Sequence, residues 1–325
     1  MSEADRSDAG HGHLSETAVS GESGPPAAET RLVWNPFLGE YGGQAPARMQ
    51  RNELTAECPF CADLTSGRAA PDAQAWVRPN DFPALLPPTG ECHILIYSPA
   101  HERTFADLTP LEARRVLELW QGVYRELSPR YAAVMIWETF GEAVGQTQRH
   151  PHGQTYAMSV IPDVLARERE LVAGEAQAGR RCPFCAEWEQ EAVGQRLVFA
   201  GAHWLAFVPP YARYPYQVRV SARRHISSVA EVASGAEADE LAQFLPRLIR
   251  AYNHVFQAPM PYMLALHQLA DARFHFHVEL LPVGRAPGKL KLAASSEMAF
   301  GFWMNDAFPE MKAAELRAAL SALPT

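Results

Sequence analysis

The sequence predicts a fold of the α+β class made of two copies of one unit. Strand-like and helix-like segments alternate along most of its 325 residues. The tetrapeptide CPFC occurs at 58–61 and again at 182–185, and in both cases a histidine, His101 or His225, follows the first cysteine by 43 positions. Each series ends in a His-x-His, which begins 49 or 50 positions further on. These coincidences in register indicate an internal repeat.

The first unit contains two strand-like segments with a helix between them. HILIYS (93–98) and YAAVMIW (131–137) are rich in the aromatic and β-branched residues that favour strands. Residues 109–127 predict a helix, because Thr109 can serve as its N-cap and Glu112 can complete a capping box.

The second unit repeats this order. Residues 234–256 predict a helix with Ser234 as N-cap and Glu237 in the capping box. The other expected elements are strands at 262–266 and 274–283 and a final helix at 309–320.

Composition limits the possible functions. Hydrophobic residues make up 47% of the chain and charged residues 20%, which is typical of a globular protein. The net charge of -8 argues against nucleic acid as a partner. No apolar run is long enough for a membrane span, and the N-terminus has no signal-peptide pattern, so we expect no membrane association and a cytoplasmic location.

The N-terminal segment differs from the rest of the chain. Residues 1–30 are rich in Ser, Gly, Ala, Pro and acidic residues and have no hydrophobic periodicity, so we expect a disordered tail. The repeat then divides the remainder into halves at 31–177 and 178–325.

Two sets of cysteines and histidines are candidate metal ligands. Two C-x-x-C pairs in a cytosolic chain indicate zinc more often than disulfides, whereas a redox motif would be expected once, at a helix start in a βαβ unit. Two thiolates and two imidazoles form a closed tetrahedral site that contributes to folding. We expect two such zinc sites, with His277 a less favoured ligand of the second: Cys58, Cys61, His101 and His150; Cys182, Cys185, His225 and His275.

The stretch HPHGQ at 150–154 is the candidate catalytic motif. On an extended segment His150, His152 and Gln154 share one face, roughly 6–7 Å apart. This spacing suits one histidine to bind metal and the next to address a substrate. A neutral imidazole is a competent nucleophile towards phosphorus, and Gly153 allows a ligand to approach the backbone. The alternative is that His152 is a buried hydrogen-bonding residue.

HPHGQ, with the upstream C-x-x-C and SPAH (98–101), resembles the galactose-1-phosphate uridylyltransferase family of the histidine-triad superfamily. The resemblance covers residues 31–322. It implies two tandem histidine-triad-like units, with an antiparallel sheet and flanking helices, each held by a metal site. It also implies a homodimer and a ping-pong reaction of galactose metabolism (the Leloir pathway), in which UMP passes from UDP-glucose through a uridylyl-histidine to galactose 1-phosphate. His152 would be the nucleophile, and Gln154 would bind the uridylyl phosphate.

The resemblance also implies substrate contacts. NDFPAL matches the family's nucleoside-binding segment, and ARMQR matches its phosphate-binding arginine pair across a dimer interface, although a solvated basic turn is the alternative for these arginines. KLAASSEM matches a segment near the hexose. WETFGE and GQTQR stand where the family has a phosphate-binding asparagine and a serine. The residues implied are Asn80, Asp81, Phe82, Arg48, Arg51, Lys291, Glu297, Thr139 and Thr147.

The second metal has two candidate ligand sets. Members of the family bind it, often as iron, with a glutamate and three histidines, which match Glu168, His267, His275 and His277. This chain also has Cys182 and Cys185, as in a two-zinc subgroup that includes ADP-glucose phosphorylase. Thiolates bind zinc more strongly than a carboxylate does, so we favour the cysteine set and expect Glu168 on a helix surface.

Two other functions are compatible with these motifs. One is an ADP-glucose phosphorylase or adenylyltransferase of the same superfamily, since no motif identifies the nucleobase. The other is a non-catalytic, zinc-containing nucleotide-binding module, against which the presence of His152, Gly153 and Gln154 argues.

Overall fold

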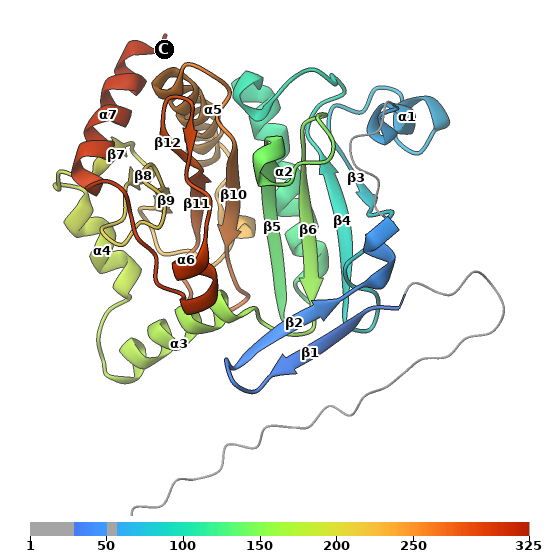
Figure 1. Cartoon of the computed structure of the whole chain (residues 1–325), viewed down its shortest axis with the longest axis horizontal. Coiled ribbons are helices and arrows are strands. Elements are labelled where there is room, and N and C mark those ends of the chain that lie inside the picture. The colour runs from blue at the N-terminus through green and yellow to red at the C-terminus, as the bar shows by residue number, and fades with distance from the viewer. Residues whose placement is uncertain (1–28, 51–56, 325) are drawn as a thin grey trace, which may run out of the picture.

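A nine-stranded antiparallel sheet forms the centre of the molecule (Figure 1). The computed structural model describes residues 29–50 and 57–324, so nearly all of the predicted tail lies outside the described residues. The strand order is β3-β4-β6-β5-β10-β11-β9-β8-β7, and every neighbouring pair is antiparallel. The predicted α+β class with an antiparallel sheet and flanking helices is confirmed.

The first half of the fold contains the two predicted strands, β4 and β5, and the predicted helix between them, α2. Its elements are α1 (Pro59–Ser66), β3 (Trp76–Pro79), β4 (Gly90–Ile96), α2 (Pro110–Leu127), β5 (Ala133–Phe140) and β6 (His152–Met158). The His-Pro-His motif therefore lies where a loop enters β6.

The second half has the same element order with one additional strand, β7, after its first helix. Its elements are α4 (Pro183–Glu191), β7 (Leu197–Ala200), β8 (Trp204–Phe207), β9 (Val218–Ala222), α5 (Ala236–Phe256), β10 (Tyr262–His267) and β11 (His277–Pro282). Strands β8-β9-β11-β10 mirror β3-β4-β6-β5, and the two sets meet where β5 pairs with β10. His277 begins β11 as His152 begins β6, which is what the sequence repeat predicts.

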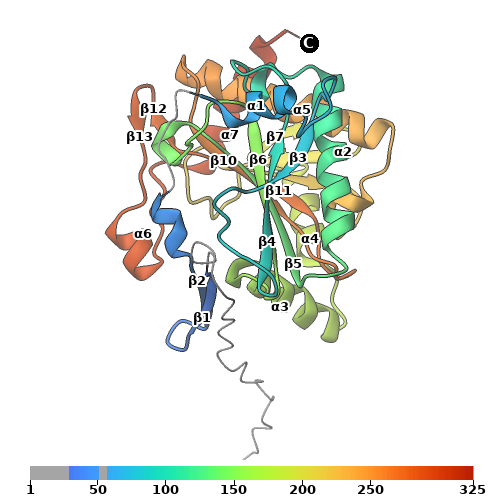
Figure 2. The ribbon, with the colours of Figure 1, turned by 90° about the vertical axis from the view of Figure 1, so that its right-hand side faces the viewer.

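Smaller elements surround the sheet. They are β1 (Arg31–Asn35), β2 (Glu40–Gln44), η1 (Pro46–Gln50), η2 (Phe105–Asp107), η3 (Glu142–Val144), α3 (Asp163–Gln177), η4 (Val229–Glu231), β12 (Gly284–Ala286), β13 (Lys289–Leu290), α6 (Ser295–Phe300) and α7 (Pro309–Ala322). Figure 2 shows α2 and α5 on one face of the sheet, and the β1–β2 hairpin and α6 on the other.

The helix starts test the predicted caps. Thr109 is the N-cap of α2, where its side chain accepts a hydrogen bond from the Glu112 backbone, so this capping box is confirmed. The prediction of Ser234 as the cap of α5 was wrong, because Gly235 occupies that position. The Glu237 side chain accepts from the Ala233 backbone, one residue before the predicted cap, and also makes a charge-assisted pair with Arg224.

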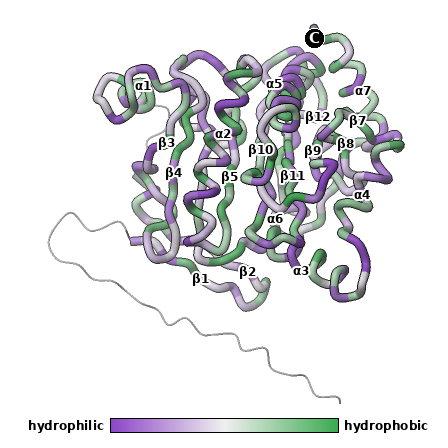
Figure 3. The backbone as a smooth tube through the Cα atoms, turned by 180° about the vertical axis from the view of Figure 1, so that it is seen from behind, coloured by the Kyte–Doolittle hydropathy of each residue, from purple (hydrophilic) through white to green (hydrophobic). Residues whose placement is uncertain are grey.

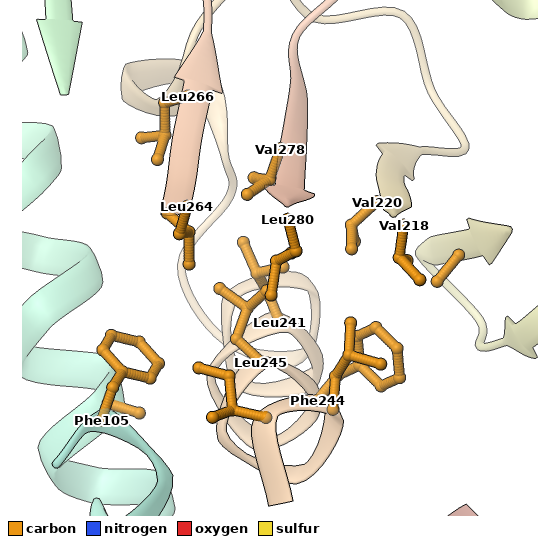
Figure 4. Packing of buried hydrophobic residues seen from close by; sticks show 14 of the residues in the cluster. Phe105, Val218, Val220, Leu241, Phe244, Leu245, Leu264, Leu266, Val278 and Leu280 are labelled. Carbon is orange, nitrogen blue, oxygen red and sulfur yellow. The ribbon is translucent and has the colours of Figure 1, made fainter. Parts of the chain in front are cut away.

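The core lies between the sheet and the α2–α5 layer. Figure 4 shows aliphatic side chains of β9, β10 and β11 against α5, among them Val278 and Leu280 of β11. Hydrophobic stretches follow these central strands in Figure 3. Because side chains alternate along a strand, His277 and Glu279 point to the opposite face. No helix among the described residues is long and apolar enough to cross a membrane.

Candidate functional site

The first predicted metal site is assembled in the structure. The ligand atoms of Cys58, Cys61, His101 and His150 all lie within 4.8 Å of one another. Cys58 precedes α1 and Cys61 lies in its first turn, while the two histidines come from loops after β4 and before β6. The measured Sγ–Nδ1 separations are 3.5 Å for Cys61 with each histidine and 3.7 Å for Cys58 with His150.

These separations fit a tetrahedral zinc ion. With Zn–S near 2.3 Å and Zn–N near 2.0–2.1 Å, the sulfur–nitrogen edge of a tetrahedron is about 3.5 Å. Burial and the neighbouring Cys58 raise the pKa of Cys61 to about 11, so a cation is needed to hold Cys61 as a thiolate. The residues present therefore suit a metal ion.

The second cysteine cluster has the same geometry. Cys182, Cys185, His225 and His275 place their ligand atoms within 4.8 Å. The Sγ–Nδ1 separations are 3.3 Å for Cys185 with His275, 3.5 Å for Cys185 with His225 and 3.7 Å for Cys182 with His275. Both Cys2His2 clusters are thus candidate metal centres of one kind.

Backbone carbonyls orient the imidazoles in both clusters. With Nδ1 of His150 directed at the thiols, its Nε2 donates to the Ser98 carbonyl at 2.7 Å. In the second cluster Nε2 of His225 donates to the Ala272 carbonyl at 3.0 Å. Such outer contacts fix the tautomer and the ring orientation of a metal-ligating histidine.

The neighbouring backbone anchors the imidazole ring of His152. Its Nδ1 lies 2.8 Å from the carbonyl oxygen of His150, so Nδ1 carries the proton and Nε2 carries the lone pair. The ring packs on Phe60, the residue between the first two ligand cysteines, with centroids 5.0 Å apart. Helix α1, the candidate ligand His150 and the candidate nucleophile His152 therefore pack together around Phe60.

Gly153 packs closely against the helix layer that covers one face of the sheet. A Cβ atom on Gly153 would lie 2.0 Å from the Tyr97 hydroxyl. That hydroxyl accepts a hydrogen bond from Trp120 of α2, so Gly153 faces the helix layer. By alternation His152 and Gln154 face the other side of the sheet.

The face beyond His152 carries several of the predicted substrate residues. Gln154 pairs with Trp137 across β6 and β5, and Trp137 packs edge-on against Tyr156 with centroids 4.6 Å apart. Thr139 lies two residues beyond Trp137 and so shares its face. Thr147 lies in the loop between η3 and β6.

The predicted nucleoside segment follows β3. Asn80 accepts a hydrogen bond from the Phe82 backbone through Oδ1, which makes a tight turn. Both carboxylate oxygens of Asp81 accept from Arg78. Arg48 of η1 donates to the Phe82 carbonyl at 3.2 Å and to the Tyr156 hydroxyl at 3.0 Å, so it joins this segment to β6 within the same chain.

The remaining predicted substrate residues are Arg51, Lys291 and Glu297. Arg51 lies outside the described residues. Lys291 is buried, donates to the Met304 carbonyl and lies 3.7 Å from Asp306. Glu297 accepts from the Ala294 backbone at the start of α6. These contacts lie within the C-terminal segment, on the side of the sheet that carries β1–β2 (Figure 2).

A third cluster corrects the expectation for Glu168. Its carboxylate is 3.0 Å from Nδ1 of His267 and 3.6 Å from Nε2 of His277, and the three ligand atoms lie within 4.8 Å. Burial opposes the ionised form, but the two histidines outweigh it and lower the pKa of Glu168. Glu168 is therefore not a helix-surface residue. The four-residue alternative set is divided, because His275 joins the cysteines.

Sequence reasoning missed Arg78 and Tyr97. Arg78 is 2% exposed and binds Asp63 and Asp81, while Tyr97 supports Gly153 from below. The sequence signal for Arg78 is a single charged residue in the otherwise apolar strand segment WVRP, which comes directly before NDF. No sequence signal identifies Tyr97.

Solved structures share this architecture. One described as a uridylyltransferase superposes with a TM-score of 0.81 at 27% identity, covering 89% of this chain and 98% of that chain. The structure of an ADP-glucose phosphorylase from Arabidopsis thaliana with bound ADP-glucose has a TM-score of 0.70 at 19% identity, with coverages of 89% and 98%, and shows the same fold. Fold and site thus define a two-half α+β protein of the uridylyltransferase class.

The sequence comparisons narrow this class to one family. The profile for the galactose-1-phosphate uridyl transferase N-terminal domain matches residues 60–162, and that for the C-terminal domain matches 177–321. The galactose-1-phosphate uridylyltransferase of Thermotoga maritima is 30% identical over 314 residues, covering 88% of this chain and 97% of that protein. The chain belongs to the galactose-1-phosphate uridylyltransferase family.

Proposed function

We propose that this chain is a UDP-glucose–hexose-1-phosphate uridylyltransferase that passes UMP to galactose 1-phosphate through a covalent intermediate on His152. One observation carries the proposal. His152 is fixed through Nδ1 to the His150 carbonyl, which leaves the lone pair on Nε2, on the face that also carries Gln154. The family membership supports both substrates.

In the first half-reaction the lone pair of His152 Nε2 forms a bond to the α-phosphorus of UDP-glucose. The bond from that phosphorus to the bridging oxygen breaks, and its electron pair leaves with glucose 1-phosphate. This leaving group needs no proton, so the site requires no general acid. The amide of Gln154 can donate to the phosphoryl oxygens without itself transferring a proton.

In the second half-reaction a phosphate oxygen of galactose 1-phosphate bonds to the same phosphorus. The nitrogen–phosphorus bond breaks, and its electrons return to Nε2. While UMP is attached the imidazole is cationic, and the Nδ1–H donated to the His150 carbonyl stabilises that charge. The backbone at His150 therefore both orients the nucleophile and supports the intermediate.

We assign substrate and metal roles by position. Asn80, Asp81 and Phe82 contact the nucleoside, and Arg48 with Arg51 contacts the phosphates. Thr139 and Thr147 lie near the reacting phosphate, and Lys291 and Glu297 serve the hexose. Zinc occupies both Cys2His2 clusters, which are structural because all four positions are filled by protein ligands.

Organisation and location complete the proposal. The halves divide near 177/178, and only the first carries the His-Gly-Gln sequence needed for chemistry. We propose a homodimer in the cytoplasm. Size-exclusion chromatography with light scattering tests the dimer.

Intact-mass spectrometry tests the proposed reaction. Chain mixed with UDP-glucose alone should gain one UMP, and the gain should be absent in His152→Ala. Galactose 1-phosphate should then remove the adduct and release UDP-galactose. ADP-glucose is run in parallel, because an ADP-glucose phosphorylase has a related fold. An AMP adduct in place of UMP, or a UMP adduct that survives His152→Ala, contradicts the proposal.

A further inference from the structure

One buried arginine connects α1 to the predicted nucleoside segment, which begins at Asn80. We call α1 the metal helix of the first half, because Cys61 lies in its first turn. Arg78, in β3, donates from one terminal nitrogen to Asp63 of α1, at 3.2 and 3.4 Å, and to the Pro59 carbonyl at 3.4 Å. Its other terminal nitrogen donates to Asp81, at 2.7 and 2.5 Å. The guanidinium carbon also lies 5.7 Å from the Phe60 ring centroid.

The burial of these groups makes the connection strong. Arg78 and Asp63 have side chains only 2–3% exposed, and Asp63 also accepts from the Trp76 indole at 3.1 Å. Asp81, in contrast, is 53% exposed on its outer side. Arg78 therefore binds a buried carboxylate on the metal helix and a carboxylate at the surface. The exposed Arg68 lies 3.7 Å from each of the two, so Arg78 is the buried one of two cations between them. A guanidinium can bind both carboxylates because its planar fork has several donors in fixed directions.

The second half contains a similar arginine, Arg219, but it comes from β9, the strand that mirrors β4 rather than β3. Asp63 and Glu187 both come two residues after the second cysteine of their CPFC motifs. Arg219 binds Glu187 at 2.7 Å and lies 5.3 Å from the Phe184 ring, as Arg78 does with Asp63 and Phe60. Its other carboxylate is Glu279 at 2.7 Å, which is buried at the position that Gln154 holds in β6.

The comparison distinguishes the arginine contact that both halves share from the Arg78–Asp81 contact of the first half. In both halves an arginine ties the metal helix to the sheet. Only in the first half does the arginine also bind a solvent-facing carboxylate in the loop after β3. In the second half Arg219 and Glu279 fill the place of the substrate face.

We propose that Arg78 is a positioning residue that sets the Asp81 carboxylate for the nucleoside and holds Phe60 against His152. This inference rests on the proposed function, because Asp81 is there assigned to the nucleoside. Arg78 does not touch the reacting atoms. It acts through Asp81 on nucleotide affinity and through Phe60, 5.0 Å from the His152 ring, on the nucleophile.

The decisive variant is the double substitution Arg78→Met/Asp63→Asn. Arg78→Met alone leaves the buried Asp63 with the Trp76 indole and with Arg68 at 3.7 Å but without its buried cation, and it can unfold the chain for that reason. In the double variant the buried charges are removed together, and Asp81 remains exposed and solvated. We expect near wild-type zinc content and melting temperature, with the KM for UDP-glucose raised about tenfold or more, the equivalent of one lost charge-assisted contact.

Two further measurements make the result specific. The Kd for UMP, measured by calorimetry, should rise together with the KM, whereas the KM for galactose 1-phosphate should change less than twofold. The control is Arg219→Met/Glu279→Gln, which removes the buried arginine–carboxylate pair of the second half. It should lower the melting temperature and leave the KM for UDP-glucose and the Kd for UMP unchanged.

The outcomes distinguish this inference from the proposed function. If wild-type chain forms the UMP adduct but the folded Arg78→Met/Asp63→Asn variant keeps wild-type KM and Kd, the positioning role is wrong. An equal rise in KM for the Arg219→Met/Glu279→Gln control also overturns it. If wild-type chain forms no UMP adduct, the proposed function fails instead.

Discussion

The Nδ1 atom of His152 lies 2.8 Å from the carbonyl oxygen of His150, while the ring of His150 faces the first pair of cysteines. One residue thus supplies a candidate metal ligand from its side chain and an orienting acceptor from its backbone. The position of the nucleophile is therefore coupled to the metal cluster through a single peptide unit. In the second half His277 makes the same contact with His275 at 2.9 Å, but Glu279 follows where the first half has Gln154.

Replacing Gln154 by glutamate should stop the reaction without unfolding the chain. Gln154→Glu keeps the size of the side chain but places a negative charge next to the phosphates of the substrate. Removing one well-placed donor to a developing oxyanion commonly lowers kcat by 10²–10³-fold, and we expect a loss of at least about 10²-fold. Rapid-quench measurement of UMP transfer to the enzyme provides the rate, and Gln154→Asn provides a neutral control. An active Gln154→Glu enzyme would show that the amide does not contact the phosphates.

Gly153→Ala tests the close packing beneath the nucleophile. The added Cβ would lie 2.0 Å from the Tyr97 hydroxyl and 2.9 Å from the Trp137 carbonyl. We expect a loss of about 1–3 kcal/mol in stability from overpacking and a lower rate, because β6 must move. Tyr97→Phe in the same chain should recover part of both.

Gly122→Ala is the control for this substitution. Gly122 is exposed in α2, and a Cβ there meets nothing within 4 Å. This change should stabilise the chain by about 0.5–1 kcal/mol. Equal melting temperatures for the two alanine variants would contradict the packing described at Gly153.

The metal clusters could be predicted from the sequence more completely than the face of the sheet that carries the substrate residues. The cysteines and histidines recur at fixed spacings, so the repeat predicted them as ligands, and the structure brings each set of four together. The third cluster was misjudged, because a choice between ligand sets assumed that Glu168 and Cys182 compete. In the structure His275 turns to the cysteines while His267 and His277 remain with Glu168.

Other features depend on contacts between distant segments. The support of Gly153 by Tyr97 joins β6 to the end of β4, and only the folded register brings these residues together. The N-cap of α5 is Gly235 and not Ser234, and Glu237 pairs with the distant Arg224, a contact that local propensity does not include. Local signals therefore predicted the ligands and α2, whereas tertiary contacts decided the surroundings of the nucleophile.

Metal analysis should find two zinc ions per chain, one in each Cys2His2 cluster. Cys61→Ser and Cys185→Ser should each reduce the zinc content to about one, because a serine hydroxyl replaces a thiolate, the stronger zinc ligand. Glu168→Gln should leave the content at two, since Glu168 belongs to neither cysteine cluster. Elemental analysis of the purified variants measures this. Iron that disappears in Glu168→Gln would instead assign the second metal to Glu168, His267 and His277.

The pH dependence of stability should reveal the buried carboxyl of Glu138. Burial raises its pKa from the ordinary 4.5 to about 8, against the hydrogen bond that it accepts from the Tyr262 hydroxyl at 2.9 Å. Between these two values the folded chain keeps a proton that the unfolded chain has released. This contribution to stability is therefore complete below pH 4.5 and is lost as the pH rises towards 8, at up to roughly 1.4 kcal/mol per pH unit.

Glu138→Gln removes this dependence and keeps a group that can accept from Tyr262. Relative to wild type, the variant should gain stability steadily between pH 5 and 8 and then keep a constant difference. Melting temperatures at pH 5.5, 7.0 and 8.5 measure the gain, with Glu170→Gln, at an exposed position of α3, as the control substitution. If the curves of Glu138→Gln and wild type also run parallel, the carboxyl is ionised in the folded chain, and a cation must then reach its second oxygen, which has no hydrogen-bond partner among the described residues.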